Sequence, residues 1–173
     1  MTAVEFPSVL ATMRAHQSLC LSSVRVSHAD RGASHLTTVG KIDGTGRKIL
    51  VIDDDLAIRV LLQAVLRRMK FEVELAEDGA VGLEKVHKNG TFDLILLDLM
   101  MPRLNGYEFI EEIGKQYGDQ RPHMIVFTAA GKRGVDKIPA DAICNSILKP
   151  FDLERFIEMV GDCLNKTHQT HSA

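Results

Sequence analysis

Leu94-Ile95-Leu96-Leu97-Asp98 is the stretch of sequence that indicates the fold of this chain most directly. Four consecutive apolar residues give a β-strand no polar face, so this strand must be buried on both sides of its sheet. Sheets buried on both faces are typical of parallel α/β proteins, in which helices connect the strands. Because the run ends at an acidic residue, we expect Asp98 to lie at the carboxyl end of a central strand.

The sequence on both sides of this strand alternates short apolar runs with amphipathic stretches of helical period. We expect five strands, over residues 48–52, 71–76, 94–97, 124–127 and 146–148. We expect helices over about 56–70 and 79–89, from the loop after Asp98 to about 117, and over about 152–165. Segment 131–143 should be a poor helix, because it contains Gly131, Gly134 and Pro139. The alternation predicts a doubly wound five-stranded parallel sheet with helices on both faces.

The chain of 173 residues is long enough for one ordinary domain and an appendage. Residues 1–47 show no sustained period and are expected to form a poorly ordered extension, which ends in a Gly44-Thr45-Gly46 linker. Residues 48–166 should form the folded domain, and residues 167–173 a flexible tail.

Composition and charge exclude several classes of protein. Hydrophobic residues make up 45% and charged residues 25%, as in ordinary globular proteins. Residues 1–48 carry six Lys/Arg against three Asp/Glu, a net +3, and the remainder carries 15 against 20, a net −5. The acidic part lacks the basic footprint of direct nucleic-acid binding, and no apolar run could span a membrane. The extension also lacks the apolar core of a secretion signal, so we expect a cytoplasmic location.

The cysteine spacing predicts neither a zinc site nor a disulfide framework. Cys20, Cys144 and Cys163 are far apart and form no C-x-x-C pair, which favours a reducing compartment. We expect Cys144 and Cys163 to be small apolar residues of the core. We expect the histidines after the extension to be surface residues rather than metal ligands: His87, His123, His168 and His171.

Polar residues of complementary type follow four of the expected strands. In open parallel sheets ligands bind beyond the carboxyl ends of the strands, so these residues should share one site: Asp53, Asp54, Asp98, Thr128 and Lys149. Clustered carboxylates repel one another where the dielectric constant is low, and oxygen ligands suit Mg²⁺. The sequence therefore predicts a magnesium site at this end of the sheet.

These residue types fit phosphoryl transfer. A carboxylate near such a metal can attack phosphorus, and Asp98 has the central position. Thr128 could donate a hydroxyl hydrogen bond to a phosphoryl oxygen, and Lys149 could pair with the same group. Taken singly, each residue could equally be a loop polar group or a helix N-cap, for which Asp55 is well placed. Four strand ends bearing complementary groups favour the functional interpretation.

A family resemblance rests on four motifs: Val51-Ile52-Asp53-Asp54-Asp55, Leu96-Leu97-Asp98-Leu99-Met100-Met101-Pro102-Arg103-Leu104-Asn105-Gly106, Phe127-Thr128-Ala129-Ala130 and Lys149-Pro150-Phe151. Together they resemble the signature of response-regulator receiver domains of two-component signalling. The resemblance implies a flavodoxin-like sheet of order 2-1-3-4-5 and phosphotransfer to Asp98 from a histidine kinase or histidine phosphotransfer protein. It also implies Mg²⁺ held by Asp54, Asp98 and the Met100 carbonyl, with Asp53 positioning a metal-bound water, and a cis Lys149–Pro150 peptide bond.

The chain departs from the family pattern at positions that affect output and lifetime. Receivers usually carry an aromatic residue three positions before the lysine, and Ser146 stands there. A serine has no ring to move between buried and exposed states, so we expect an altered output surface. By the resemblance, Met100 and Ala130 border the approach of hydrolytic water. Neither side chain can activate water, which predicts slow autodephosphorylation.

The sequence thus favours a stand-alone switch of a two-component system or phosphorelay, which turns over no external substrate. Only about seven residues follow the last helix, so an unidentified downstream protein should receive the signal, and a homodimer is compatible with the sequence. One alternative is a receiver-fold scaffold that acts without phosphorylation, which Ser146 keeps open. Another is an aspartyl-phosphate phosphohydrolase, disfavoured because Met100 stands where a second acid is needed.

Overall fold

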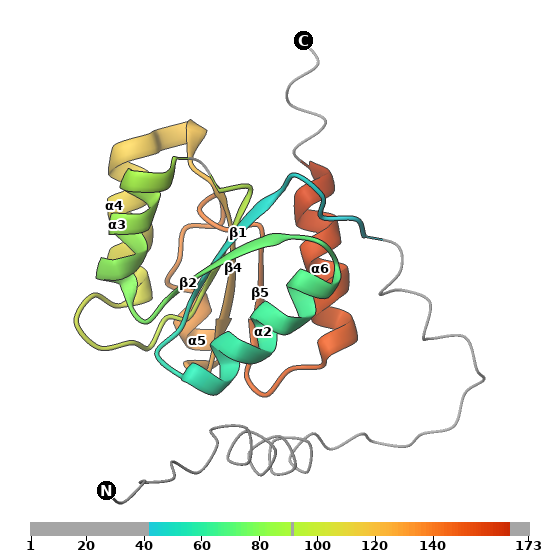
Figure 1. Ribbon diagram of the computed structural model, residues 1–173. Coiled ribbons are helices and arrows are strands. Elements are labelled where there is room, and N and C mark those ends of the chain that lie inside the picture. The colour runs from blue at the N-terminus through green and yellow to red at the C-terminus, as the bar shows by residue number, and fades with distance from the viewer. Residues whose placement is uncertain (1–41, 91, 167–173) are drawn as a thin grey trace, which may run out of the picture. The chain divides into compact units, whose positions relative to one another are not determined.

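The computed structural model describes residues 42–90 and 92–166 as a single sheet with helices on both faces (Figure 1). The elements follow in the order β1 (Lys48–Ile52), α2 (Leu56–Arg68), β2 (Glu72–Ala76), α3 (Gly79–Asn89), β3 (Leu94–Leu97), α4 (Gly106–Tyr117), the 3-10 turn η2 (Gly118–Gln120), β4 (His123–Thr128), α5 (Gly131–Val135), β5 (Asn145–Leu148) and α6 (Leu153–Lys166). All neighbouring strands are parallel, in the order β2-β1-β3-β4-β5. The predicted flavodoxin-like order is confirmed.

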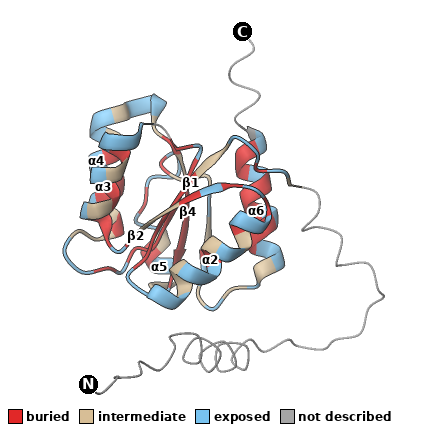
Figure 2. Cartoon of the chain, in the orientation of Figure 1, coloured by how far each residue is buried: buried red, intermediate tan, exposed pale blue. Residues whose placement is uncertain are grey.

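Strand β3 is the centre of the sheet and is completely buried. Every residue from Leu94 to Leu97 is fully shielded from solvent, between β1 on one side and β4 on the other (Figure 2). Leu94 and Leu96 face one layer of helices, and Ile95 and Leu97 face the other. The expectation of a strand without a polar face is thus confirmed, and its carboxyl end is fixed in the middle of the domain.

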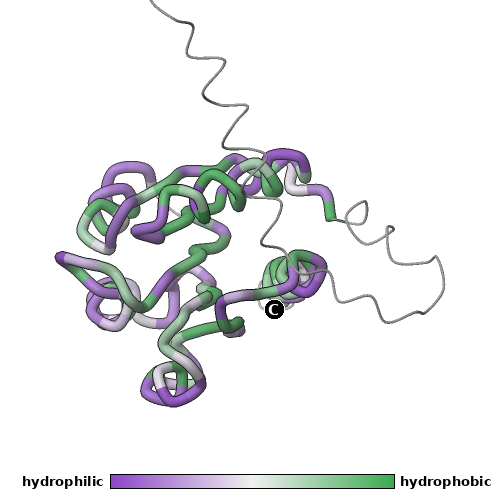
Figure 3. Tube along the Cα trace, turned by 90° about the horizontal axis from the view of Figure 1, so that it is seen from below, coloured by the Kyte–Doolittle hydropathy of each residue, from purple (hydrophilic) through white to green (hydrophobic). Residues whose placement is uncertain are grey.

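The two faces of the sheet are covered by different helices. On one face, α2 and α6 pack through residues such as Leu66 and Phe156. On the other, α3 and α4 pack through residues such as Val86 and Phe109. Seen from below, hydrophobic positions follow the strands and inner helix surfaces, and hydrophilic positions lie on the outer turns (Figure 3). Burial of these two apolar layers is the main force that holds the sheet together.

Side-chain caps fix where the helices begin, close to the ends of the preceding strands. The Asp55 carboxylate accepts from Ala57 N–H at 2.7 Å, and the Asp78 carboxylate accepts from Val81 N–H at 2.8 Å. Asn105 and Glu108 form a capping box at the start of α4. The capping role expected for Asp55 is therefore confirmed, which leaves Asp53 and Asp54 for the strand-end site.

The segment between β4 and β5 contains very little helix. Helix α5 ends at Val135 after five residues, and no regular element follows it before β5. Ile138 and Ala142 nevertheless remain buried against the sheet. The expectation of a poor helix over 131–143 is confirmed, and the physical reason is the glycine and proline content of the segment.

The residues before β1 differ from what the sequence indicates. Gly44, expected in a free linker, donates its N–H to the Met69 carbonyl at 2.8 Å, and the Arg47 N–H closes a turn onto Gly44. Ile42 packs against the core beneath α6. The Gly44–Gly46 stretch is thus a turn held against the domain. The expectations for residues 1–41 and 167–173 lie outside the described residues. Among the helices described, none has the length and apolar character to cross a membrane.

The loop after β3 is tied to its surroundings by backbone contacts. The Gly106 N–H donates to the Leu99 carbonyl at 3.1 Å, and the Gly79 N–H donates to the Leu104 carbonyl at 3.1 Å. A Cβ atom on Gly106 would collide with the Asp98 carbonyl oxygen and the Leu99 Cα. Only glycine therefore lets α4 begin so close behind Asp98.

Replacing Gly106 should disturb this loop, whereas the same change later in α4 should not. We expect Gly106→Ala to lower the free energy of unfolding by about 1–3 kcal/mol, because backbone atoms cannot move aside cheaply. The matched control is Gly114→Ala, where an added Cβ meets open space. It should stabilise the helix by about 0.5–1 kcal/mol. Urea denaturation of both variants measures the two effects, and equal effects would contradict the close approach at Gly106.

Candidate functional site

Asp53, Asp98 and Lys149 lie one position beyond their strands, where backbone hydrogen bonds still hold them. The Asp53 N–H donates to Ala76 on β2 at 3.2 Å, and the Asp98 N–H donates to Ile52 on β1 at 2.9 Å. The Lys149 N–H donates to Thr128 on β4 at 2.9 Å. The sheet thus continues for one residue into the site and sets the backbone position of these three side chains.

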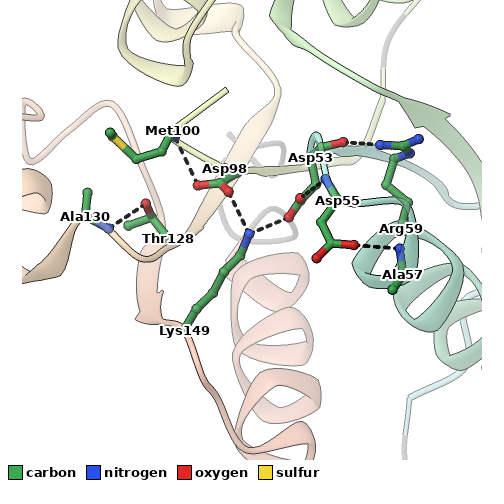
Figure 4. A network of polar contacts seen from close by, with 9 residues as sticks. All are labelled: Asp53, Asp55, Ala57, Arg59, Asp98, Met100, Thr128, Ala130 and Lys149. Atoms are coloured by element: carbon green, nitrogen blue, oxygen red, sulfur yellow. Dashed lines mark hydrogen bonds and ion pairs between the residues drawn. The ribbon is translucent and has the colours of Figure 1, made fainter. Parts of the chain in front are cut away.

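Lys149 connects the two buried carboxylates of the site. Its Nζ lies 2.6 Å from Asp53 Oδ2 and 2.6 Å from Asp98 Oδ2, so one ammonium group bridges both side chains (Figure 4). The same Nζ lies 5.0 Å from the centre of the Phe127 ring, which adds a cation–π contact from β4. The long lysine stem allows a residue at the edge of the sheet to reach its centre.

Three carboxylates gather at this end of the sheet. Asp53 is fully buried and Asp98 is 4% exposed, whereas Asp54 is exposed. One oxygen atom from each lies within 4.8 Å of the others. With Lys149 protonated, three carboxylates and one ammonium leave a net charge of −2. Oxygen ligands with this uncompensated charge fit a divalent cation such as Mg²⁺.

Local hydrogen bonds orient the two buried carboxylates. Asp53 accepts the Asp55 N–H on Oδ1 at 2.8 Å, and the Asp53 carbonyl accepts from the Arg59 guanidinium at 2.6 Å. Asp98 accepts the Met100 N–H on Oδ1 at 3.1 Å. Each carboxylate therefore uses one oxygen for a backbone N–H and the other for Lys149, which limits its rotation.

The loops after β3 and β4 form the other side of the site. Thr128 is buried, and its hydroxyl oxygen accepts the Ala130 N–H at 3.1 Å. Met100 is 60% exposed. A cleft of about 480 Å³ lies between Asp54 and the loop after Asp98. A ligand group could therefore approach past Asp54, although the two nearest acids are buried.

Burial and charge pairing shift the pKa values in opposite senses. Burial raises the pKa of the Asp53 carboxyl above its ordinary value, because desolvation outweighs the hydrogen bonds from Lys149 and Asp55. Burial alone would lower the pKa of Lys149, but its hydrogen bonds to Asp53 and Asp98 outweigh that effect and raise it. The lysine thus stays charged, while Asp53 carries negative charge that one ammonium does not fully compensate.

The structure brings Asp53, Asp54, Asp98 and Lys149 together, and Figure 4 shows Thr128 on the Met100 side of Asp98. The Lys149–Pro150 peptide bond is cis, as the resemblance implies. The metal contact expected from the Met100 carbonyl stays a prediction. Sequence reasoning missed two supports, Arg59 on the Asp53 carbonyl and Phe127 beside Lys149. The only sequence signal for Arg59 was its position outside the apolar stripe of its helix.

The expectation that the cysteines form no disulfide is wrong, and so is the surface position expected for His123, whereas Cys163 lies in the core as expected. Cys144 and Cys163 form a disulfide, with their Cα atoms 5.9 Å apart. His123 is half-buried, and its Nδ1 lies 3.1 Å from Cys144 Sγ. The two cysteines are 19 residues apart, so the sequence does not show that the start of β5 and the second half of α6 are neighbours. His87 is on the surface, where it pairs with Gln116 as expected for an exposed histidine.

Comparison with known families identifies this arrangement. Residues 49–161, more than half of the chain, match the model of the response regulator receiver domain. The chain belongs to this family. The receiver domain accounts for the parallel sheet, the acidic strand ends and the lysine, and it places the chain in two-component signalling.

Individual relatives show the same assignment. The chain is 34% identical over 127 residues to the response regulator ArlR of Staphylococcus saprophyticus, covering 70% of this chain and 54% of ArlR. It is 36% identical over 121 residues to MprA of Mycobacterium sp. strain KMS, covering 69% and 51%. The chain therefore spans about half the length of these relatives. The crystal structure of TrrA from Thermotoga maritima with Mg²⁺–BeF matches with a TM-score of 0.60 at 32% identity, covering 68% of this chain and 98% of TrrA.

The raised pKa of Asp53 predicts a pH-dependent cost to stability. An acid with a raised pKa in the folded state favours folding while it is protonated, and this contribution is lost as the pH rises through the folded pKa. In chelator at pH 7, Asp53→Asn should therefore increase the free energy of unfolding. That gain should shrink as the pH falls toward the ordinary pKa of aspartate, where the wild-type carboxyl is neutral too.

Urea denaturation of the wild type and Asp53→Asn over a pH series measures this difference. Asp162→Asn, an exposed site on α6, is the matched control and should change stability little. Added Mg²⁺ should stabilise the wild type more than Asp53→Asn. If Asp53→Asn were less stable than the wild type at pH 7 without metal, the claim that the charge of Asp53 is not fully compensated would be wrong.

Proposed function

We propose that the chain is a phosphorylation-dependent switch in which Asp98 accepts a phosphoryl group from a phosphohistidine. The donor is a histidine kinase or a histidine phosphotransfer protein of a two-component system or phosphorelay. The observation that supports this most strongly is the bridge from Lys149 to Asp53 and Asp98, which together with the nearby Asp54 leaves a net charge of −2 at the site. A cytoplasmic location is part of the same proposal.

Mg²⁺ is the cofactor in this proposal. Asp54 and Asp98 would ligate the metal with the Met100 carbonyl, and Asp53 would hold a metal-bound water. The relative TrrA, solved in complex with Mg²⁺–BeF, supports this choice. When bound, the metal neutralises charge on the phosphoryl oxygens and so lowers the barrier to transfer.

The described side chains divide the work of phosphoryl transfer. An Asp98 carboxylate oxygen attacks phosphorus, a P–O bond forms, and the P–N bond to the donor histidine breaks. Lys149, already hydrogen-bonded to Asp98, can pass to a phosphoryl oxygen without leaving the site. Thr128 can turn its hydroxyl hydrogen toward the same group, since its oxygen is held by Ala130 N–H. No general base is needed, because the attacking carboxylate carries no proton.

Apolar residues near the site support a protein as the phosphoryl donor. Leu56, at the start of α2, is 63% exposed and Met100 is 60% exposed. Val60 and Leu61 continue the exposed apolar surface along α2, and Leu148 precedes the lysine on β5. Exposed apolar side chains of this size beside a reactive carboxylate suit a protein surface better than a small polar ester.

The output face differs from the arrangement usual in the family. Ser146 pairs in register with Val126 on β4 and is half-buried. Helix α5, the element that precedes β5, is a single short turn of helix. The Tyr107 hydroxyl donates to the Gly134 carbonyl at 3.1 Å, which connects α4 to α5. We propose that phosphorylation reaches a downstream protein through this irregular segment rather than through a rotating aromatic residue.

Labelling with acetyl phosphate and Mg²⁺ tests the proposed acceptor. Intact mass should show one added phosphoryl group on the wild type and none on Asp98→Ala. Asp162→Ala, an exposed carboxylate on α6, should label like the wild type. Failure of the wild type to label, with a competent kinase failing as well, would leave a scaffold that acts without phosphorylation.

The same preparation tests the class of activity. We propose that the chain phosphorylates only itself and turns over no external substrate. Incubation with small phosphomonoesters and Mg²⁺ should therefore release no phosphate beyond one equivalent. Sustained multiple turnover would identify a phosphohydrolase instead.

The aspartyl phosphate should be long-lived, because neither Met100 nor Ala130 can orient or activate a water molecule. We expect a half-life of minutes or longer for the phosphorylated wild type, followed by loss of the added mass. Met100→Asn and Ala130→Glu should each hydrolyse severalfold faster, since both introduce a hydrogen-bonding group. Met100→Leu is the apolar control and should match the wild type. A wild-type half-life of seconds would refute the prediction.

A further inference from the structure

A second group of reactive side chains lies at the other end of the sheet from Asp98. His123 is the first residue of β4, and Cys144 comes just before β5. Thr128 and Lys149, at the opposite ends of the same two strands, belong to the acceptor site. Cys163 joins the group from α6, and the proposed phosphotransfer uses none of these three residues.

The three side chains are close enough to react with one another. The Cys144–Cys163 bond connects β5 to α6, and His123 Nδ1 lies 3.1 Å from Cys144 Sγ. The two sulfur atoms and a histidine nitrogen all lie within 4.8 Å of each other. The Cys144 N–H donates to the Met124 carbonyl at 2.7 Å, which fixes the cysteine backbone against β4.

The two sulfurs differ in their access to solvent. Cys163 is 1% exposed and packs in the core between α6 and the sheet. Cys144 is half-buried and lines a concavity of about 240 Å³ together with His123 and Arg121. A small thiol or disulfide can therefore approach Cys144 from this concavity, whereas Cys163 is shielded.

We propose that Cys144, Cys163 and His123 form a reversible thiol–disulfide exchange site for low-molecular-weight thiols and disulfides. Cys144 is the residue that reacts with the small molecule. Cys163 resolves the mixed disulfide, and His123 accepts and returns the proton. This site shares no residue with the phosphoryl chemistry at Asp98.

Oxidation proceeds in two balanced exchange steps. His123 takes the Cys144 thiol proton, and the thiolate attacks a small-molecule disulfide, forming a mixed disulfide and releasing one thiolate, which takes up the proton. The Cys163 thiolate then attacks Cys144 Sγ, forming the protein disulfide and releasing the second small thiol, to which the Cys163 proton passes. The protein loses two electrons and two protons, and the small disulfide becomes two thiols. Reduction runs through the same steps in reverse.

The bond constrains the segment between the two cysteines. That segment contains β5, which includes Ser146, the following Lys149 and most of α6. With the bond formed, α6 is fastened to the start of β5, and with the bond open it is held by packing alone. The redox state of the pair therefore changes how firmly the lysine-bearing segment is held at its far end.

A redox titration of the full chain tests the proposal. Wild type and Cys20→Ser are equilibrated with reduced and oxidised glutathione at varied ratios, and free thiols are then alkylated and located by peptide mass. We expect Cys144 and Cys163 to pass together between protected and alkylated forms, reversibly. Thermal unfolding should occur at a lower temperature in the reduced form. Asp98→Ala should give the same titration, so failure of phosphorylation would not affect this result.

Single variants in the Cys20→Ser background test the order of the steps. Cys163→Ser should accumulate a stable mixed disulfide at Cys144, whereas Cys144→Ser should react slowly because Cys163 is buried. His123→Gln should slow alkylation of reduced Cys144 about tenfold at neutral pH and shift its pH–rate profile upward. Should a variant fail to fold, the alkylation rates of the two cysteines in the folded wild type decide the same point.

Three results would overturn the proposal. A disulfide that cannot be opened without unfolding the chain would be a purely structural bond. Thiols that never oxidise together would exclude the exchange steps. Thiols of the wild type that Zn²⁺ protects stoichiometrically and a chelator releases, without disulfide formation, would make the group a metal site.

Discussion

The site depends on one ammonium group that lies between two buried carboxylates. Burying Asp53 and Asp98 side by side without a cation would cost several kcal/mol of unfavourable electrostatic energy, on the order expected for desolvated ions. Lys149 reduces this cost at 2.6 Å from each. That geometry requires β1 and β3 to be neighbours, and it requires a lysine stem long enough to reach from β5 past Phe127. Strand order and the length of the lysine side chain together determine how close the ammonium group lies to the two carboxylates.

In this arrangement two buried carboxylates, Asp53 and Asp98, share one ammonium group, so one negative charge is not compensated. The raised pKa of Asp53 reflects this uncompensated charge, and the exposed Asp54 adds to it. The fold therefore stores an electrostatic cost at the carboxyl ends of its strands, which a bound cation would relieve. Because Lys149 belongs to the turn between β5 and α6, a change in its partners acts directly on that turn.

Much of this could be predicted from the sequence, for a specific physical reason. In a parallel sheet the residues that end the strands lie along one edge, so Asp53 and Asp98 on the adjacent strands β1 and β3 are neighbours, and Lys149 reaches them from β5 through its long side chain. The same reasoning applied to strand beginnings would have paired His123 with Cys144. Cys163 could not be found this way, because its place depends on how α6 crosses the sheet. The turn at Gly44 was not predicted from the sequence, because the glycines indicated a linker. In the structure Gly44 lies close against the Phe71 ring.

Helix α6 is constrained at two neighbouring positions of its second half. A Cβ on Gly161 would lie 2.7 Å from Ile42 Cδ1, so the chain before β1 fits into a notch that only glycine provides. Two residues later Cys163 is bonded to Cys144. The helix is therefore anchored where the chain approaches β1, and its other end follows the lysine turn. Because Gly161–Cys163 is the anchored region, a small displacement of the lysine turn would tilt the helix about these residues. It would not slide the helix along its axis.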